Sequence, residues 1–113
     1  MRLVNKRNNI TIAEKVYTAD TLFSRLKGLL GTKSLHPDHV LIINNTKQIH
    51  SFFMQFPIDV LFLDKNRTVI KIYKNFKPYR ISTFLLNAKY VVELAQGALE
   101  KKDVSKGDTI DWQ

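Results

Sequence analysis

A carboxylate within an apolar strand sets the strongest constraint on how this chain folds. In the segment Ile58–Asp64 the apolar residues occupy both alternating positions, and Asp59 shares its set with Leu61 and Leu63. Successive side chains of a β-strand point to opposite faces of the sheet, so both faces of this strand are apolar. We therefore expect a central, buried strand. Because burial of an unpaired charge is costly, Asp59 needs hydrogen-bond donors, a charged partner or a ligand.

Size and composition indicate one small domain. The chain has 113 residues, of which 44% are hydrophobic and 25% charged, and we expect residues 1–113 to fold as a single unit. It has no cysteine, which excludes disulfides and thiolate nucleophiles. Residues 1–8 carry charge with no apolar run behind them, and Val60–Leu63 is far too short to cross a membrane. These features predict a cytoplasmic protein with no membrane partner.

The hydrophobic pattern predicts a β-rich α+β fold. Apolar residues at helical spacing indicate one main helix at about residues 19–30, and Gly97–Lys102 suits a short helix or turn. Residues 75–86 read as irregular and rich in aromatic side chains. We expect a curled antiparallel sheet or a barrel-like arrangement. Its predicted strands are residues 2–5, 10–13 (reaching at most Tyr17), 40–43, 49–53, 58–64, 68–73, 90–94 and 109–112.

The charge is strongly basic and unevenly placed. The formal net charge is +8, and no acidic residue lies between Asp64 and Glu93. Such a region favours an anionic partner, although a basic surface that only aids solubility has the same sequence. The cations of this stretch are Lys65, Arg67, Lys71, Lys74, Lys77, Arg80 and Lys89.

Two carboxylates on predicted core strands are candidate catalytic groups. Asp59 and Glu93 would form an acid/base pair if their environments separated their pKa values. They would equally serve as structural acceptors for backbone amides or for a buried Arg25. His50 is a candidate base, ligand or hydrogen-bond donor to Asp59. These residues would support a hydrolytic or acid/base enzyme.

Metal, cofactor and nucleotide chemistry have little support in the sequence. His50, Asp59 and Glu93 have the donor atoms for a metal site, but no short-spaced motif such as His-x-x-x-His occurs. The four glycines form neither a phosphate-binding loop nor a dinucleotide-binding motif. We therefore expect no metal and no cofactor.

A basic strand suggests a different function. Alternation along the predicted strand 68–73 places Arg67, Lys71 and Tyr73 on one face. A row of cations with an aromatic side chain is typical of surfaces that bind single-stranded nucleic acid. A solvated face of an antiparallel sheet has the same pattern, so nucleic-acid or protein interaction stays open as an alternative.

Several segments of the chain resemble the sequence motifs of the family known as domain of unknown function 192. The resemblance covers nearly the whole chain, and its pieces occur in the family's order and spacing. They are the signature segment His50–Asp64, the helix end Arg25–Leu30, the loop Pro78–Arg80, the Glu93-x-x-x-Gly97 motif and the closing Gly107-Asp108.

The resemblance implies a compact, single-domain, β-rich α+β fold found in bacteria and archaea, and it implies no particular reaction. Two positions depart from the usual pattern. Gln55 stands where the family commonly has Lys or Arg, and Leu30 where it often has Met.

The leading hypothesis is a binding module with one polar pocket for a small or anionic ligand. In this hypothesis Arg25, His50, Asp59 and Glu93 line or support the pocket, and Arg80 adds a cation from a neighbouring loop. The alternatives are the acid/base enzyme that uses Asp59 and His50, and the interaction domain that uses the Arg67–Tyr73 face.

Overall fold

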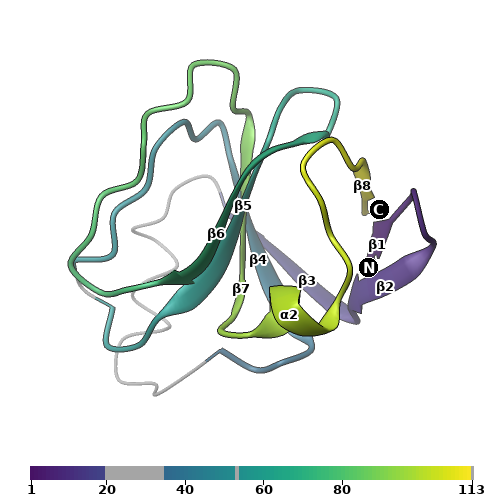
Figure 1. Ribbon diagram of the computed structural model, residues 1–113, viewed down its shortest axis with the longest axis horizontal. Helices are drawn as coiled ribbons and strands as arrows, with labels where there is room; N and C mark the ends of the chain where they lie inside the picture. The colour runs from purple at the N-terminus through teal and green to yellow at the C-terminus, as the bar shows by residue number, and fades with distance from the viewer. Residues whose placement is uncertain (20–34, 53, 113) are drawn as a thin grey trace.

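The structure is a computed structural model that describes residues 1–19, 35–52 and 54–112, and it is mostly β-sheet (Figure 1). The predicted helix at about residues 19–30, with Arg25, falls outside the described residues except for Ala19. The elements are β1 (Leu3–Asn5), β2 (Ile10–Ala13), β3 (Lys15–Ala19), β4 (His39–Asn44), β5 (Ile58–Leu63), β6 (Val69–Phe76), β7 (Tyr90–Ala95), α2 (Ala98–Lys101) and β8 (Ile110–Asp111).

The strands form two sheets. A five-stranded sheet has the order β3-β4-β7-β5-β6, and a three-stranded sheet has the order β2-β1-β8. Neighbouring strands are antiparallel except for β3 and β4, which are parallel. The predicted small β-rich fold is therefore confirmed. Its strands are divided between these two sheets.

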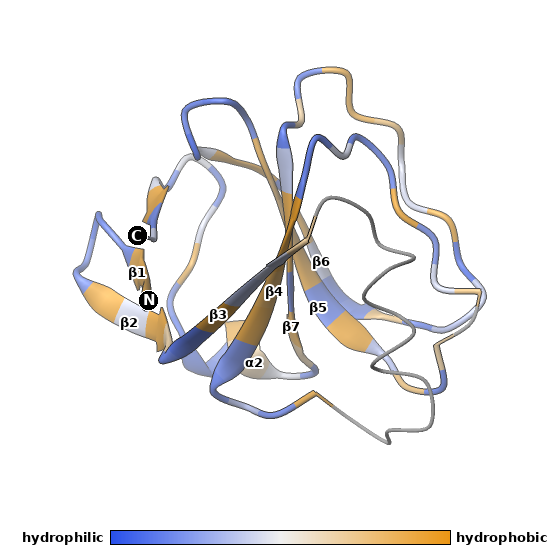
Figure 2. Ribbon diagram, turned by 180° about the vertical axis from the view of Figure 1, so that it is seen from behind, coloured by the Kyte–Doolittle hydropathy of each residue, from blue (hydrophilic) through white to orange (hydrophobic). Residues whose placement is uncertain are grey.

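The central strand β5 lies between β6 and β7, and all of its residues are buried. Its two faces belong to two different hydrophobic cores. Leu61 and Leu63 pack with residues of the small sheet, such as Leu3 and Ile110. The other face, with Phe62, packs against a core that includes residues from the loop before β5. Figure 2 shows the hydrophobic character of the central strands and the hydrophilic turns at their ends.

Two predicted strands differ from the observed ones. For the predicted strand 49–53, the described residues 49–52 belong to no named strand, and among them only His50 makes a β-bridge, to Ile81. The predicted second strand ends at Ala13, and β3 begins a new strand in the other sheet. The change of sheet occurs at Glu14, where the N–H groups of Glu14 and Lys15 both donate to the carbonyl of Asp38.

None of the helices among the described residues is long and apolar enough to cross a membrane.

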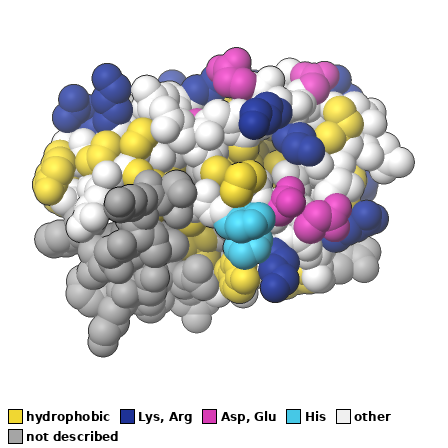
Figure 3. Space-filling view, turned by 90° about the horizontal axis from the view of Figure 1, so that it is seen from below, with side chains coloured by type: hydrophobic (Ala, Val, Ile, Leu, Met, Phe, Trp, Pro, Cys, Tyr) yellow, Lys and Arg dark blue, Asp and Glu magenta, His cyan; other side chains and the backbone are white. Residues whose placement is uncertain are grey.

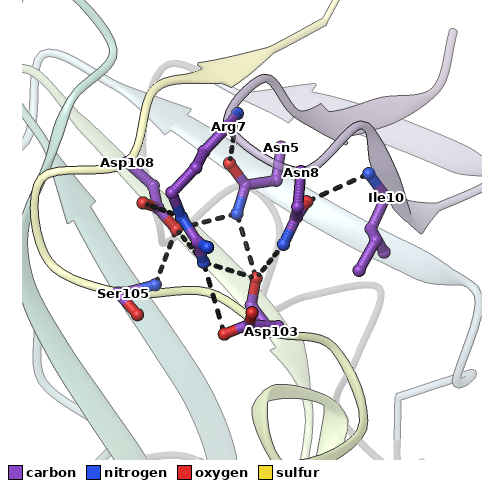
Figure 4. A network of polar contacts seen from close by, with 7 residues as sticks. All are labelled: Asn5, Arg7, Asn8, Ile10, Asp103, Ser105 and Asp108. Atoms are coloured by element: carbon purple, nitrogen blue, oxygen red, sulfur yellow. Dashed lines mark hydrogen bonds and ion pairs between the residues drawn. The ribbon is translucent and has the colours of Figure 1, made fainter.

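A polar network fastens the first hairpin to the C-terminal segment (Figure 4). The Arg7 guanidinium donates to both oxygens of the buried Asp108, at 2.7 and 3.2 Å. The Asn5 amide and the Ser105 backbone N–H each donate to Asp108 at 2.8 Å. These bonds, those of Arg7 above all, hold the pKa of Asp108 below its ordinary value against the opposing effect of burial.

This network predicts a specific acid sensitivity. Because the pKa of Asp108 is lower in the folded than in the unfolded chain, its contribution to stability is complete above the ordinary Asp value of about 4. This contribution to stability is lost as the pH falls through the pKa that Asp108 has in the folded chain. The free energy of unfolding should therefore fall more steeply below about pH 4 in the natural chain than in Asp108→Asn. Urea unfolding between neutral and acidic pH measures both curves, and equal slopes would contradict the prediction.

Candidate functional site

The Asp59 carboxylate joins three elements of the fold. The side chain is 1% exposed. Its Oδ1 accepts the N–H of Asn75 in β6 at 2.9 Å, and its Oδ2 accepts the N–H of Leu99 in α2 at 3.0 Å. Both donors need such an acceptor, because the pairing of β6 is irregular around Asn75 and the first turn of a helix has free amides. Asp59 therefore acts as a buried acceptor of backbone hydrogen bonds.

The same junction extends to a cavity. Asn75 adopts a left-handed backbone conformation (φ 57°), and its side-chain oxygen accepts a hydrogen bond from the Gln96 amide at 2.9 Å. Gln96 lies between β7 and α2 and lines a cavity of about 230 Å³. Asp59 thus supports this wall of the cavity from behind, through Asn75 and through α2.

The walls of the cavity come from two segments that are distant in sequence. One is the loop before β4, and the other is the corner between β7 and α2. Gly97 makes that corner with a φ of 85°, a conformation that side chains with a Cβ rarely adopt. The complete lining is Pro37, Asp38, Ala95, Gln96, Gly97, Ala98, Lys101 and Lys102.

The lining carries opposite charges on its two walls. Lys101 and Lys102 lie on the α2 wall, and Asp38 lies on the other. The Asp38 backbone is fixed at both ends. Its carbonyl accepts two N–H groups from residues 14 and 15, and its N–H donates to Nδ1 of His36 at 3.1 Å. A cavity with these charges suits a small ligand that itself carries charge.

Two stacked histidines adjoin the Asp38 wall. The rings of His36 and His39 are 4.2 Å apart, and Figure 3 shows histidine side chains at the surface beside acidic and basic ones. Burial lowers the pKa of His39 below its ordinary value, and the charges of His36 and Lys15 lower it further. The imidazole of His39 is therefore neutral at pH 7. Among the described residues, no three His, Cys, Asp or Glu side chains are grouped as a metal site requires.

The sheet separates Asp59 from Glu93. In the β5–β7 register Asp59 pairs with Leu94, and Glu93 pairs with Val60. The two carboxylates therefore point to opposite faces, and they do not form the acid/base pair considered from the sequence. Both are buried, at 1% exposure each. The sequence revealed their burial but not the register that divides them.

Ser51, which follows His50 and which the sequence analysis did not select, bonds to the backbone of Arg80. Ser51 is buried, and its N–H donates to the carbonyl of Arg80. Its hydroxyl donates to the carbonyl of Lys77 and accepts the N–H of Arg80 at 3.0 Å. A serine next to His50 in an apolar segment was the available signal. His50 itself pairs with Ile81 and stacks on Phe52 at 5.0 Å.

The predicted row formed by Arg67, Lys71 and Tyr73 is interrupted. The register of β5 and β6 shifts between Phe62 and Leu63, so the side chains of β6 do not alternate regularly. The guanidinium of Arg67, whose side chain is 33% exposed, stacks 3.6 Å from the ring centre of Trp112, a residue of the core between the sheets. Tyr73 packs against the opposite core, with the Lys71 ammonium 5.3 Å from its ring. Arg67 therefore does not share a face with Tyr73.

A second hollow of about 440 Å³ lies beside the N-terminal strand. Its walls include Arg2, Asp111 and Trp112, but none of the motif residues named above. The smaller cavity has Gly97 in its wall and Asp59 behind it, so we regard the smaller cavity as the candidate site.

The fold and the position of the motif residues define a class: a small, two-sheet, β-rich domain with a buried aspartate at the junction of β5, β6 and α2. The family model DUF192, described as "Uncharacterized ACR, COG1430", matches residues 3–112. The chain belongs to this family, as the resemblance had indicated.

Relatives and solved structures agree with this assignment. A UPF0127 protein from Thermococcus sibiricus is 35% identical over 98% of this chain and 74% of its own length. The UPF0127 protein PH1112 from Pyrococcus horikoshii is 33% identical over 97% of both chains. A "putative transcription regulator" from Sinorhizobium meliloti has a TM-score of 0.76 and 24% identity over 97% of this chain and 89% of its own. A protein of unknown function from Novosphingobium aromaticivorans has a TM-score of 0.76 and 18% identity over 98% of this chain and 82% of its own. The two structural likenesses show the fold alone.

The role of Asp59 as an acceptor predicts a large effect on stability. Asp59→Ala leaves the buried N–H of Leu99 and the partly buried N–H of Asn75 without their acceptor, at about 1–3 kcal/mol for a buried group and less for a partly exposed one. The free energy of unfolding in urea should fall by about 2–4 kcal/mol. Asp64→Ala is the matched control, since Asp64 also accepts two backbone N–H groups but in a partly exposed turn. An Asp59 variant no less stable than the Asp64 variant would contradict this role.

Proposed function

We propose that this chain is a binding module for a small charged ligand, and that the cavity between Asp38 and Lys101 is its binding site. One observation carries the proposal: a cavity with cations on one wall and a carboxylate on the other, one wall of which is supported by the buried Asp59.

The size and charge of the cavity suggest the class of ligand. At about 230 Å³ it is smaller than the pockets of about 300–1,000 Å³ that hold drug-sized molecules. The ammonium groups of Lys101 and Lys102 suit a carboxylate on the ligand, and Asp38 suits an amine. A small zwitterion such as a free amino acid has both groups. Gln96 offers an amide oxygen as a further acceptor.

In this proposal Asp59 positions the site and does not touch the ligand. Both of its oxygens already accept backbone N–H groups, which leaves the carboxylate poorly suited to act as a base. The acid/base enzyme receives less support for the same reason, and because Glu93 lies on the other face of the sheet. The proposal keeps the predicted binding module for a small ligand, with a zwitterion in place of a plain anion. It moves the lining to residues that the sequence analysis did not select as ligand-binding.

Thermal unfolding with free amino acids tests the proposal. A ligand that binds only the folded state, present at about 100 times its Kd, adds about 2.7 kcal/mol of stability, so the Tm should rise by about 10 °C. At least one of the twenty amino acids should produce this rise. Its N-acetyl derivative and its decarboxylated amine should not, because each lacks one of the two charges.

Variants of the lining assign the effect to the cavity. Asp38→Asn and Lys101→Met should each abolish the shift in Tm, whereas Lys106→Met should retain it, because Lys106 is exposed and does not line the cavity. Absence of any shift, or a shift that survives Lys101→Met and Lys102→Met together, would overturn the proposed site. A shift in Tm that persists with the N-acetyl derivative and in Asp38→Asn would contradict the proposal that the ligand is a zwitterion. It would indicate that the ligand is a plain anion.

A further inference from the structure

Large hydrophobic side chains are exposed together on two long loops. The loops run side by side at the edge of the molecule opposite the small sheet (Figure 1), and we call residues 47–52 and 77–86 the loop platform. Of the seven large hydrophobic residues that are exposed in the described part of the chain, the platform supplies five. These are Phe52 (39% exposed), Tyr79 (69%), Ile81 (60%), Phe84 (57%) and Leu86 (72%).

The backbone of the platform is held in place from behind. Ser51 bonds to residues 77 and 80, as described above. Ser82 is buried, and its hydroxyl accepts the N–H of Ile49 at 2.9 Å. From β6, the Tyr73 hydroxyl accepts the N–H of Thr83 at 2.9 Å. These contacts fix the exposed side chains on an ordered backbone, so little conformational entropy is lost when a surface binds them.

The backbone is strained at Tyr79, one of these exposed residues. Tyr79 has a φ of 61°, a conformation that is uncommon for residues other than glycine, asparagine and aspartate. Its N–H donates to the carbonyl of Ser51, which fixes this conformation. An exposed aromatic ring on a strained, anchored backbone is typical of a contact site.

Cations accompany the hydrophobic residues, and acidic residues are missing from the whole region. Residues 39–58 and 65–92 contain no Asp or Glu. Lys47, Lys77, Arg80 and Lys89 are all exposed on or next to the platform. Figure 3 shows hydrophobic side chains with Lys and Arg beside them at this end of the molecule.

We propose that the loop platform docks on the surface of an anionic lipid bilayer, a partner that the sequence analysis did not expect. Exposed aliphatic and aromatic side chains enter the boundary between headgroups and acyl chains, and flanking lysines and arginines contact anionic headgroups. The very high exposure of Ile81, Phe84 and Leu86 suits insertion into a surface better than it suits a peptide bound in a groove. The absence of acidic residues matches the negative charge of such a bilayer. None of these residues lines the cavity, so this proposal is independent of the proposed function.

Co-sedimentation with vesicles tests the docking surface. The probes are vesicles of phosphatidylcholine alone and of phosphatidylcholine with about 30% phosphatidylglycerol. The chain should sediment with the anionic vesicles and remain in solution with the neutral ones. Arg80→Glu should lower the partition coefficient by about thirtyfold, and Phe84→Ser and Leu86→Ser by about tenfold each. Since all three side chains are exposed, circular dichroism should show unchanged folding.

Matched controls separate this surface from general charge. Lys106→Glu and Lys6→Glu change the net charge as Arg80→Glu does, but they lie in exposed turns away from the platform, and binding should stay within about twofold. Failure to sediment at low salt, or an equal loss in Lys106→Glu, would overturn the proposal. Displacement by poly-L-glutamate, with Phe84→Ser and Leu86→Ser binding normally, would also overturn it and indicate an acidic protein as the partner.

Discussion

The Asp59 carboxylate is the interaction on which the centre of this structure depends. It lies on a strand that is buried on both faces, and it accepts one N–H from an irregular position in β6 and one from the first turn of α2. A charged acceptor inside a protein is stable only when donors surround it, so these three elements are constrained to meet at this point. The short helix α2, the corner at Gly97 and Gln96 all adjoin that meeting point.

The two buried carboxylates of the large sheet lie on its opposite faces. On the face toward the small sheet, Asp59 supports the cavity beside α2. On the other face, Glu93 is buried on the side where the core includes Ile49 of the loop platform and Met54 just after it. Asp59 and Glu93 therefore belong to separate groups, one behind the proposed cavity and one beside the loop platform. At a third position, Asp108 and Arg7 close the small sheet onto the C-terminal segment.

Sequence reasoning succeeded where a rule of periodicity applied, and it did not succeed where contacts between distant residues decide the outcome. Alternation in Ile58–Asp64 correctly placed β5 in the centre and Asp59 in the interior. Alternation in residues 67–73 gave a row of cations that the structure lacks, because the register of β6 shifts. The cavity could not be predicted, since Asp38 and Lys101 approach each other only when β4, β7 and α2 are assembled. Ser51 was missed because a lone serine has no periodic signature.

The sequence by itself determined the β-rich class, the family, the central strand and the need for Asp59 to have a partner, since these depend on local alternation and on the energetic penalty of a buried charge. Only the tertiary structure decided what that partner is. It also decided that Asp59 and Glu93 lie on opposite faces, because strand register is set by pairing across the whole sheet. The carboxylate that the sequence marked as a candidate catalytic group is, in the folded chain, the acceptor that joins β5, β6 and α2.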